Sequence, residues 1–320
     1  MIKNKNILIT GGAGFIGTSL FEELSKFNNF IIVIDNFNDY YDGKEEQFTE
    51  LTSHLTLNND YKLMRRNLLD NSIYEQIEEN IDIIFHLAAQ AGVRYSIENA
   101  SEISHNNIIS TVNVYDYAVK NDIDKVIYAS SSSIYGNPEY TPVDENHPKN
   151  PISPYAISKL AGEIYADYYY REYSLPVASN RFYTVYGPRG RPDMAIRKFF
   201  HRILNEEQIL IYGDGEQLRD FTYISDIING LILSAEKEKS NGEVFNLGCS
   251  NPISVNQLVD KMYNIADKPK NVKYVEERKG DVRVTHSDIT KAKKILNYHP
   301  KITIDEGLKK TFNWIIQWEQ

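Results

Sequence analysis

The chain has little of several features that would define other classes of protein. It has one cysteine, Cys249, so it cannot form an intramolecular disulfide. No apolar run approaches the roughly 20 residues that span a bilayer, and the N-terminus lacks the apolar region of a secretory signal. Its 35 Lys and Arg against 44 Asp and Glu give a net charge of −9. This balance argues against nucleic acid or an anionic membrane as a partner, because both attract clustered cations. We therefore expect a cytoplasmic protein.

The sequence does have short apolar runs that alternate with stretches of helical period, which is typical of a parallel sheet built from β-α-β units. The predicted strands are Asn6–Thr10, Phe30–Asp35, Tyr61–Asn67, Ile81–Ala89, Lys125–Ser131 and Pro176–Thr184. The predicted helices between them are Phe15–Phe27, Ser72–Glu79, Ile97–Asn121 and Ser153–Glu172. We therefore predict an α/β protein with a Rossmann-type doubly wound parallel sheet, in which ligands bind at the carboxyl ends of the strands.

The alternation loosens after Thr184, where a loop rich in Gly, Pro and Arg follows. A turn at residues 213–215 and a closing helix from about Ile304 to Gln317 come later. We predict two domains from this change. Residues 1–183 and 221–249 would form the Rossmann domain, and residues 184–220 and 250–320 would form a smaller C-terminal substrate-binding lobe.

A glycine-rich turn after the first strand predicts a dinucleotide site. Gly11, Gly14 and Gly17 would allow a tight turn, close approach of the backbone to a pyrophosphate, and close packing of helix on strand. Asp35, at the end of the second strand, can accept hydrogen bonds from the ribose hydroxyls of adenosine. Because its carboxylate would repel a 2′-phosphate, we expect NAD rather than NADP.

A Tyr-x-x-x-Lys spacing occurs twice in the chain, at Tyr40–Lys44 and Tyr155–Lys159. The first copy lies in a polar loop, and we interpret it as chance. The second follows Ser153-Pro154, a pair typical of a helix start, which would place Tyr155 and Lys159 on one helix face. A Lys in that place can lower the tyrosine pKa from about 10, so the phenol could act as a base. Four consecutive serines, 130 to 133, add hydroxyls at the ligand-binding edge.

Six motifs together resemble the extended short-chain dehydrogenase/reductases, and among them the NAD-dependent nucleotide-sugar epimerases. The motifs are Gly11-x-x-Gly14-x-x-Gly17, His86-Leu87-Ala88-Ala89, Ser130 to Gly136, Tyr155-x-x-x-Lys159, Arg181 to Pro188, and Arg219-Asp220-Phe221. In that family the enzyme oxidises the sugar at C4 to a ketone, lets the ketone turn over, and returns the hydride to the other face.

The resemblance implies roles for individual residues. Tyr155 would be the base, Lys159 would tune it, and Ser131 would contact O4 of the sugar. The residues expected to bind NAD are Gly11, Gly14, Phe15, Ile16, Gly17, Asp35, Asn36, Asn67, Leu68, Leu87, Ala88, Ala89, Asn107, Ala129, Tyr155 and Lys159. The residues expected to bind the UDP-sugar are Arg94, Ser131, Ser132, Ser133, Tyr155, Thr184, Arg191, Tyr212, Arg219 and Arg283. Among these, Arg219 and Arg283 match the diphosphate ligands, and Tyr212 stands where an aromatic ring stacks on uracil.

The residues around the serines bear on the type of reaction. The 4,6-dehydratases of the family resemble Thr-Asp-Glu where this chain has Ser131 to Ser133, and the decarboxylases usually carry Glu where Ser133 stands. The run from Thr184 to Ala195 and the segment Ala91 to Ser96 are similar to UDP-glucuronate 4-epimerases. The resemblance therefore implies a UDP-glucuronate 4-epimerase.

A uronate carboxylate would fit a hydroxyl and a guanidinium, and Thr184 and Arg191 could supply both. The residues alone leave the alternative open that Arg191 is a solvated loop residue and Thr184 packs at a strand end. A 4-epimerase for UDP-glucose or UDP-N-acetylglucosamine also stays open, and less so a UDP-glucuronate decarboxylase or a non-catalytic NAD-binding protein. The seven scattered His indicate no metal site. The resemblance implies a homodimer formed through Ile97–Asn121 and Ser153–Glu172.

Overall fold

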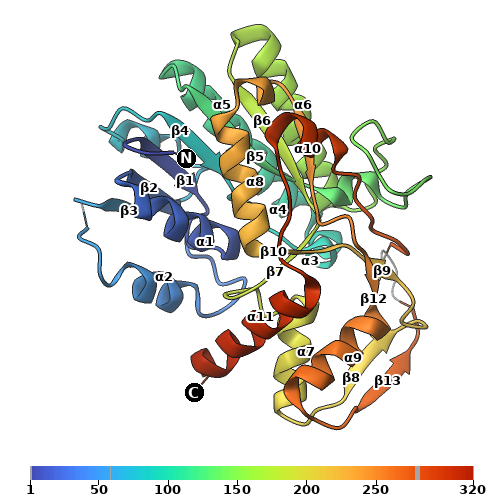
Figure 1. The fold of residues 1–320 in the computed structure, drawn as a ribbon. Coiled ribbons are helices and arrows are strands. Elements are labelled where there is room, and N and C mark those ends of the chain that lie inside the picture. The colour runs from blue at the N-terminus through green and yellow to red at the C-terminus, as the bar shows by residue number, and fades with distance from the viewer. Residues whose placement is uncertain (1, 58, 278–281, 320) are drawn as a thin grey trace.

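The computed structural model describes residues 2–57, 59–277 and 282–319. Its centre is a seven-stranded sheet in the order β11-β6-β5-β4-β1-β2-β3, with every neighbouring pair parallel (Figure 1). The strands are β1 Asn6–Thr10, β2 Phe30–Asp35, β3 Tyr61–Arg65, β4 Ile83–His86, β5 Lys125–Ser131, β6 Val177–Phe182 and β11 Val244–Leu247. The predicted Rossmann-type sheet is confirmed, and the chain between residues 221 and 249 adds its seventh strand.

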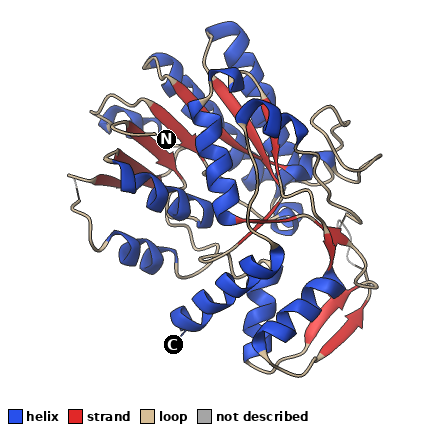
Figure 2. Ribbon diagram, in the orientation of Figure 1, coloured by secondary structure: helices blue, strands red, loops and turns tan. Residues whose placement is uncertain are grey.

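Helices cover both faces of the sheet (Figure 2). The helices are α1 Phe15–Leu24, α2 Lys44–Thr52, α5 Ser110–Lys120, α6 Pro154–Tyr173 and α8 Ile224–Glu236. Successive strand residues serve opposite faces: Ile7 and Ile9 of β1 pack in one core with α1 and α8, and Leu8 packs in another with α5 and α6. Because both faces are buried, these strands are almost continuously apolar.

The smaller lobe stands beside the carboxyl ends of the strands (Figure 1). Its elements are β7 Thr184–Tyr186, α7 Ala195–Leu204, β8 Ile209–Tyr212, β9 Leu218–Arg219, β12 Ile253–Ser254, α9 Val255–Ala266, β13 Val272–Val275 and α11 Ile304–Glu319. β13 pairs parallel with β8, and β7 pairs with β10 Phe221–Tyr223. Short elements elsewhere in the chain include η1 Ser25–Phe27, η4 Ser132–Tyr135, η5 Glu238–Ser240 and α10 Thr290–Leu296. Within the described ranges, no helix is both long and apolar enough to cross a membrane.

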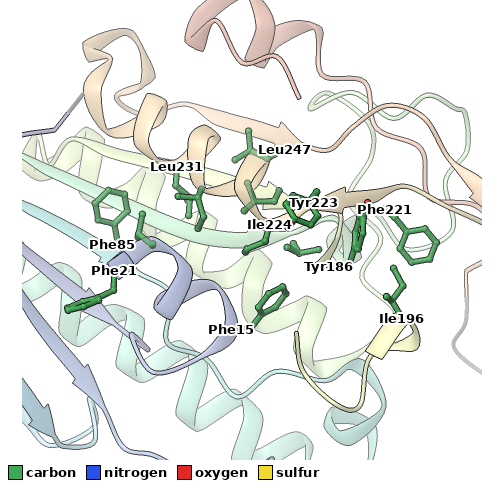
Figure 3. Close-up of a cluster of buried hydrophobic side chains, with 14 of the residues drawn as sticks. Phe15, Phe21, Phe85, Tyr186, Ile196, Phe221, Tyr223, Ile224, Leu231 and Leu247 are labelled. Carbon is green, nitrogen blue, oxygen red and sulfur yellow. The ribbon is translucent and has the colours of Figure 1, made fainter. Parts of the chain in front are cut away.

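One hydrophobic core extends from the sheet into the lobe. Phe85 of β4 and Leu231 of α8 belong to the same buried cluster as Ile196 of α7. The aromatic residues Tyr186 and Phe221 belong to it too, and Phe221 lies beside Ile196 (Figure 3). The rings of Tyr186 and Phe221 meet edge to face with centroids 6.2 Å apart. This continuous packing places the lobe firmly against the strand ends.

Two predicted helices were wrong, and one helix was missed. The predicted helix Ile97–Asn121 is broken into α3 Val93–Glu98, α4 Ala100–Ser104, a π-helical turn η3 His105–Ile109, and α5. The break falls at Asn99, whose φ of −125° and ψ of 44° are not helical. The predicted helix Ser72–Glu79 is a 3-10 turn, η2 Asn71–Gln76. Helix α2 was not predicted, because its mostly polar sequence has no clear apolar period.

Candidate active site

A cavity of about 500 Å³ lies at the carboxyl edge of the sheet. Most of the predicted site residues line it: Gly11, Gly14, Phe15, Ile16, Gly17, Asp35, Asn36, Asn67, Leu68, Leu87, Ala88, Ala89, Ala129, Ser131, Ser132, Ser133, Tyr155, Lys159, Thr184, Arg191 and Arg219. The strands end there in parallel, so segments far apart in the sequence deliver their side chains to one place.

The glycine-rich turn has the geometry of a phosphate cradle. Gly11 has φ +71°, and a Cβ on it would lie 2.7 Å from the Ala88 backbone. A Cβ on Gly17 would lie 2.2 Å from the Gly11 carbonyl oxygen, so this contact between turn and helix requires glycine. Helix α1 starts directly after Gly14 with no side-chain cap and no acidic residue in its first turn. Its first amides are therefore suited to an anion in the cavity.

Asp35 closes the same end of the cavity. Its carboxylate accepts hydrogen bonds from the backbone N–H of Ala13 at 3.0 Å and of Phe37 at 2.8 Å. Burial raises the pKa of the Asp35 carboxyl, whereas these two amides and the charge of Lys44 lower it. Each carboxylate oxygen keeps a second lone pair, so Asp35 can still accept from ribose hydroxyls.

The predicted catalytic pair starts helix α6. The Ser153 hydroxyl accepts the Ala156 N–H at 3.2 Å, and Pro154 takes the first helical position, as the sequence predicts. This start places Lys159 Nζ 5.9 Å from the centre of the Tyr155 ring. Lys159 Nζ donates to the carbonyl oxygen of Ala129 at 2.7 Å. The contact fixes the lysine beside the serines that end β5.

Burial is the largest cause of the pKa shifts of both Tyr155 and Lys159. Burial raises the pKa of the Tyr155 hydroxyl, and the groups that oppose this rise are Arg191 and the Ser131 hydroxyl. Burial also lowers the pKa of Lys159 to about 7, against the effect of Glu163. With a pKa of about 7, Lys159 is partly charged near neutral pH.

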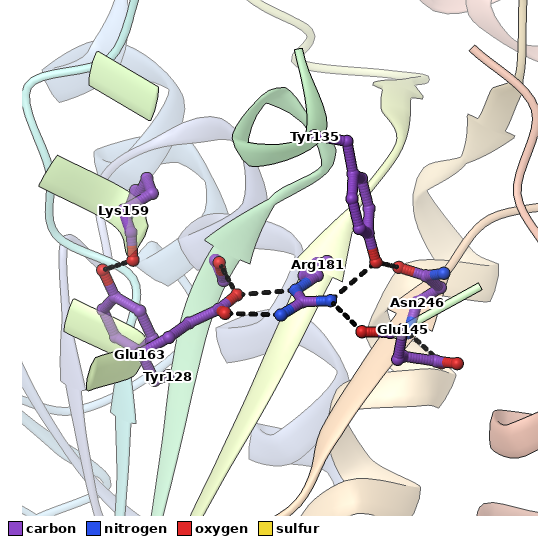
Figure 4. A network of polar contacts seen from close by, with 8 residues as sticks. Tyr128, Tyr135, Glu145, Lys159, Glu163, Arg181 and Asn246 are labelled. Atoms are coloured by element: carbon purple, nitrogen blue, oxygen red, sulfur yellow. Dashed lines mark hydrogen bonds and ion pairs between the residues drawn. The ribbon is translucent and has the colours of Figure 1, made fainter. Parts of the chain in front are cut away.

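A buried polar network holds α6 against the sheet (Figure 4). The Arg181 guanidinium of β6 donates from Nε and Nη2 to the two carboxylate oxygens of Glu163, at 2.8 and 2.7 Å. Arg181 Nη1 donates to the Tyr135 hydroxyl at 2.7 Å, and Tyr135 donates to Asn246 at 2.7 Å. Because Glu163 lies one turn after Lys159, the network fixes the turn of α6 that carries the lysine.

Asn107 was expected to contact the cofactor, but it does not line the cavity. It is 3% exposed, and its side chain accepts the Gln90 N–H at 2.7 Å and donates to the Ser158 hydroxyl at 3.0 Å. The π-helical turn η3 carries Asn107, which joins the loop after β4 to α6. Such turns are frequent near functional sites.

Three expected substrate residues also lie outside the residues that line the cavity: Arg94, Tyr212 and Arg283. Arg283 instead forms an exposed two-bond ion pair with Asp214, at 2.8 and 2.7 Å. Arg191 lines the cavity, but its guanidinium already pairs with Asp193. Among the described residues, no group of three or more His, Cys, Asp or Glu could hold a metal ion.

Sequence reasoning missed several residues that line the cavity, above all Tyr40, Tyr41 and Lys44. The chance interpretation of Tyr40–Lys44 was right that no helix aligns the two, because α2 begins only at Lys44. It overlooked that the loop after β2 must run along the edge where ligands bind. The position of the loop at the end of a parallel strand was the signal that could have found it.

The glycine cradle, the acid that ends β2, and the Tyr-Lys pair beside the serines of β5 define a short-chain dehydrogenase/reductase of the extended type. The family model described as GDP-mannose 4,6 dehydratase matches residues 8–311. The chain belongs to this family of nucleotide-sugar enzymes.

The chain is similar to known proteins and to solved structures over nearly its full length. A UDP-glucuronate 4-epimerase of Thermodesulfobacterium geofontis is 39% identical, covering 96% of this chain and 95% of the relative. The UDP-glucuronic acid 4-epimerase of Bacillus cereus, solved with UDP-glucuronic acid and NAD, has a TM-score of 0.91 and 33% identity, covering 98% and 99% of the two chains. A UDP-N-acetylglucosamine 4-epimerase of Methanobrevibacter ruminantium, solved with UDP-N-acetylmuramic acid, has a TM-score of 0.92 and 33% identity, covering 99% and 100%.

Proposed function

We propose that this protein is an NAD-dependent 4-epimerase of UDP-sugars that interconverts UDP-glucuronate and UDP-galacturonate. The observation that carries the proposal is that Tyr155, Lys159 and Ser131 share one cavity with Thr184 and Arg191. The first three are the residues for proton transfer at an alcohol, and the last two suit a carboxylate. The similarity to UDP-glucuronate 4-epimerases supports the same substrate.

NAD fits the residues at the β1 end of the cavity. The uncapped start of α1 and the close contacts of Gly11 and Gly17 suit its pyrophosphate, and Asp35 suits the adenosine ribose. Held by these residues, NAD would supply the hydride acceptor and donor for C4 of the sugar.

The residues of the chain would handle the proton and the orientation of the sugar. The Tyr155 hydroxyl, as phenolate, takes the proton of O4 during oxidation and returns it during reduction. Lys159, whose Nζ lies 5.9 Å from the centre of the Tyr155 ring, would favour the phenolate when its ammonium is charged. Ser131 accepts a hydrogen bond from the Ser133 hydroxyl at 2.9 Å, which orients its own hydroxyl and would let it donate to O4 of the sugar.

The cavity argues against dehydration, although the family model is described by a dehydratase. Elimination of water from C5 and C6 needs an acid and a base. Among the described residues that line the cavity, the one carboxylate is Asp35, at the ribose end. The nearby carboxylate of Glu163 is held by Arg181 at 2.7 Å, so it is not available as a catalytic group. Epimerisation is therefore the favoured reaction.

The experiment that tests the function is turnover of three substrates. The protein is incubated with UDP-glucuronate, UDP-glucose and UDP-N-acetylglucosamine, and the C4 epimers are followed by proton NMR. We expect UDP-galacturonate as the main product, and loss of at least about a thousandfold in kcat for Tyr155→Phe. Faster turnover of a neutral sugar would favour the alternative epimerases. Bound NAD without turnover of any sugar would favour a non-catalytic protein.

Arg191, Thr184 and the serines would also suppress a side reaction. In a 4-keto uronate, the C5–C6 bond can break with loss of CO₂, and the electron pair left on C5 then takes a proton from solvent. Holding the carboxylate so that this bond lies away from the carbonyl π system prevents the loss. We expect Arg191→Ala to release more UDP-pentose per turnover. Unchanged product partition and unchanged KM would contradict this role.

We also propose a homodimer, formed through α6 and the helices beside it. On α6 the side chains of Ile157, Ile164 and Tyr168 are 50%, 62% and 42% exposed, and Ile97 of α3 is 51% exposed. An apolar surface of this kind is typical of an interface between subunits. Light scattering at micromolar concentration should give twice the chain mass of 36.9 kDa, and a monomeric mass would contradict the proposal.

A further inference from the structure

Two loops and the start of helix α3 meet at the mouth of the cavity around the ring of Tyr40. We call the residues Tyr40, Gly92, Tyr95, Arg191 and Asp193 the mouth cluster. Tyr40 comes from the loop after β2, Gly92 and Tyr95 from the start of α3, and Arg191 and Asp193 from the loop after β7. None of the catalytic roles described above uses Tyr40 or Asp193.

Arg191 is held from two sides in this cluster. Its Nε and Nη2 donate to the two carboxylate oxygens of Asp193, at 2.9 and 2.8 Å. Its guanidinium lies over the face of the Tyr40 ring, 5.5 Å from the ring centre. The Tyr40 hydroxyl donates to Oδ2 of Asp193 at 3.2 Å. The tyrosine therefore contacts both partners of the ion pair and fixes the plane of the guanidinium.

Tyr40 is itself fixed by its neighbours. A Cβ on Gly92 would lie 2.3 Å from the Tyr40 hydroxyl oxygen, so this approach requires glycine. The Tyr95 ring meets the Tyr40 ring edge to face, with centroids 5.5 Å apart and planes at 73°. The Tyr40 ring, which lies against Arg191, is thus itself held by the start of α3.

The ion pair with Asp193 determines which N–H donors of Arg191 are left for a substrate. A guanidinium has five N–H donors, and Asp193 uses two of them, which leaves three. Arg191 lines the same cavity as Tyr155 and Thr184, whereas Asp193 is not among the residues that line it. Two of the remaining donors suit the two oxygens of a carboxylate on the sugar.

Asp193 also changes the charge that the cavity presents. The Arg191 side chain is 21% exposed and that of Asp193 is 42% exposed, so water screens the pair only in part. The carboxylate offsets much of the positive charge beside the sugar. Recognition of an anionic sugar then depends on hydrogen-bond geometry more than on net charge.

We propose that Asp193 and Tyr40 are positioning residues that make Arg191 specific for a C6 carboxylate, by fixing its guanidinium with three donors left for the substrate. The inference rests on the proposed function, because it assigns the mouth cluster to the discrimination between UDP-hexuronates and UDP-hexoses. Gly92 and Tyr95 act through Tyr40.

The test compares Asp193→Asn and Tyr40→Phe with the wild-type holoenzyme, using UDP-glucuronate and UDP-glucose. Dissociation constants are measured by calorimetry, and KM and kcat by proton NMR. For Asp193→Asn we expect about tenfold weaker binding and higher KM for UDP-glucuronate, with UDP-glucose unchanged within twofold. For Tyr40→Phe, which keeps the ring and loses one hydrogen bond, we expect about threefold weaker binding of UDP-glucuronate only.

Asp305→Asn is the matched control, because Asp305 pairs with Lys261 at a comparable exposure and lies outside the cavity lining. This variant should leave the dissociation constant, KM and kcat unchanged for both UDP-glucuronate and UDP-glucose. Equal losses for both sugars in Asp193→Asn would overturn the inference, since they would indicate a merely structural residue. Tighter binding of UDP-glucuronate would also overturn it, because Asp193 would then only compete with the substrate. Absence of turnover in the wild type would count against the proposed function, while the two binding constants would still test the inference.

Discussion

Two arginine–carboxylate pairs of this protein have almost the same geometry and opposite surroundings. Arg181 and Glu163 lie between β6 and α6, with N···O distances of 2.8 and 2.7 Å and side chains 2% and 5% exposed. Arg283 and Asp214 lie in the C-terminal lobe, with distances of 2.8 and 2.7 Å and both side chains 54% exposed. Distance alone therefore does not distinguish the two pairs.

The difference between the pairs follows from the solvent. In the buried pair, separating the partners would leave each charge without water or a counter-ion. The two side chains therefore stay hydrogen-bonded to each other. In the exposed pair, water screens both charges, and little energy is needed to separate them. Arg283 can thus leave Asp214 for another anion, such as the diphosphate that it was expected to bind, whereas Arg181 stays on Glu163.

The largest effect should come from breaking the buried pair. Arg181→Met leaves the Glu163 carboxylate buried and unpaired, and should lower the free energy of unfolding by about 3–5 kcal/mol in urea denaturation. The double variant Arg181→Met with Glu163→Gln should recover part of this loss. A loss below about 1 kcal/mol for the single variant would show that water reaches the site.

The second effect is a pH dependence at Lys159, one turn from Glu163. Burial lowers its pKa to about 7 in the folded protein, whereas an unfolded lysine titrates near 10.4. Between these values the unfolded chain binds the extra proton, so stability rises with pH, by at most about 1.4 kcal/mol per pH unit. The cost of burying the charge is complete below pH 7 and absent above about 10.4.

Urea denaturation of the wild type and Lys159→Met at several pH values checks this. The difference in free energy of unfolding between the two should move in favour of the wild type from pH 7 to pH 10. A difference that does not change with pH would mean that Lys159 keeps its ordinary pKa in the folded protein.

A smaller loss is expected where the network loses one neutral group. Tyr135→Phe removes the hydroxyl that accepts from Arg181 and donates to Asn246. Arg181 Nη1 keeps its bond to the Glu145 carbonyl oxygen at 3.2 Å. The free energy of unfolding should fall by about 1–2 kcal/mol, and thermal unfolding would measure it. An unchanged stability would indicate that water replaces the hydroxyl.

The smallest effect on stability should come from the exposed pair. Arg283→Ala should leave the midpoint of urea denaturation unchanged and raise the KM for the UDP-sugar about fivefold, through lost attraction to the diphosphate. Lys270→Ala, which breaks an exposed pair with Asp260 in the same lobe, is the control and should change neither quantity. A lower midpoint for Arg283→Ala alone would remove the contrast between the two pairs.

The sequence predicted the parts of the protein that depend on neighbours along the chain. Strands β1, β2 and β5 have the predicted bounds, because continuous apolar runs mark strands buried on both faces. The glycine turn and the start of α6 at Ser153-Pro154 are likewise local, since a few adjacent residues fix the backbone there. The turn of the cradle and the helical spacing of the Tyr-Lys pair could therefore be predicted from adjacent residues, whereas their contacts with Ala88 and Ala129 come from other strands.

The tertiary structure alone decided which group each charged or polar side chain meets. Tyr40 and Asp193 are hydrogen-bonded although 153 positions separate them, and Arg283 pairs with Asp214 across 69 positions. Such contacts arise between loops without periodicity, so no pattern in the chain marks them. Burial by the surrounding elements also lowered the pKa of Lys159. It likewise decided whether an arginine–carboxylate pair is shielded from water, as for Arg181, or exposed to it, as for Arg283. The chain itself thus determined the sheet, the dinucleotide cradle and the Tyr-Lys pair, and the packing of distant loops determined how the arginines are held.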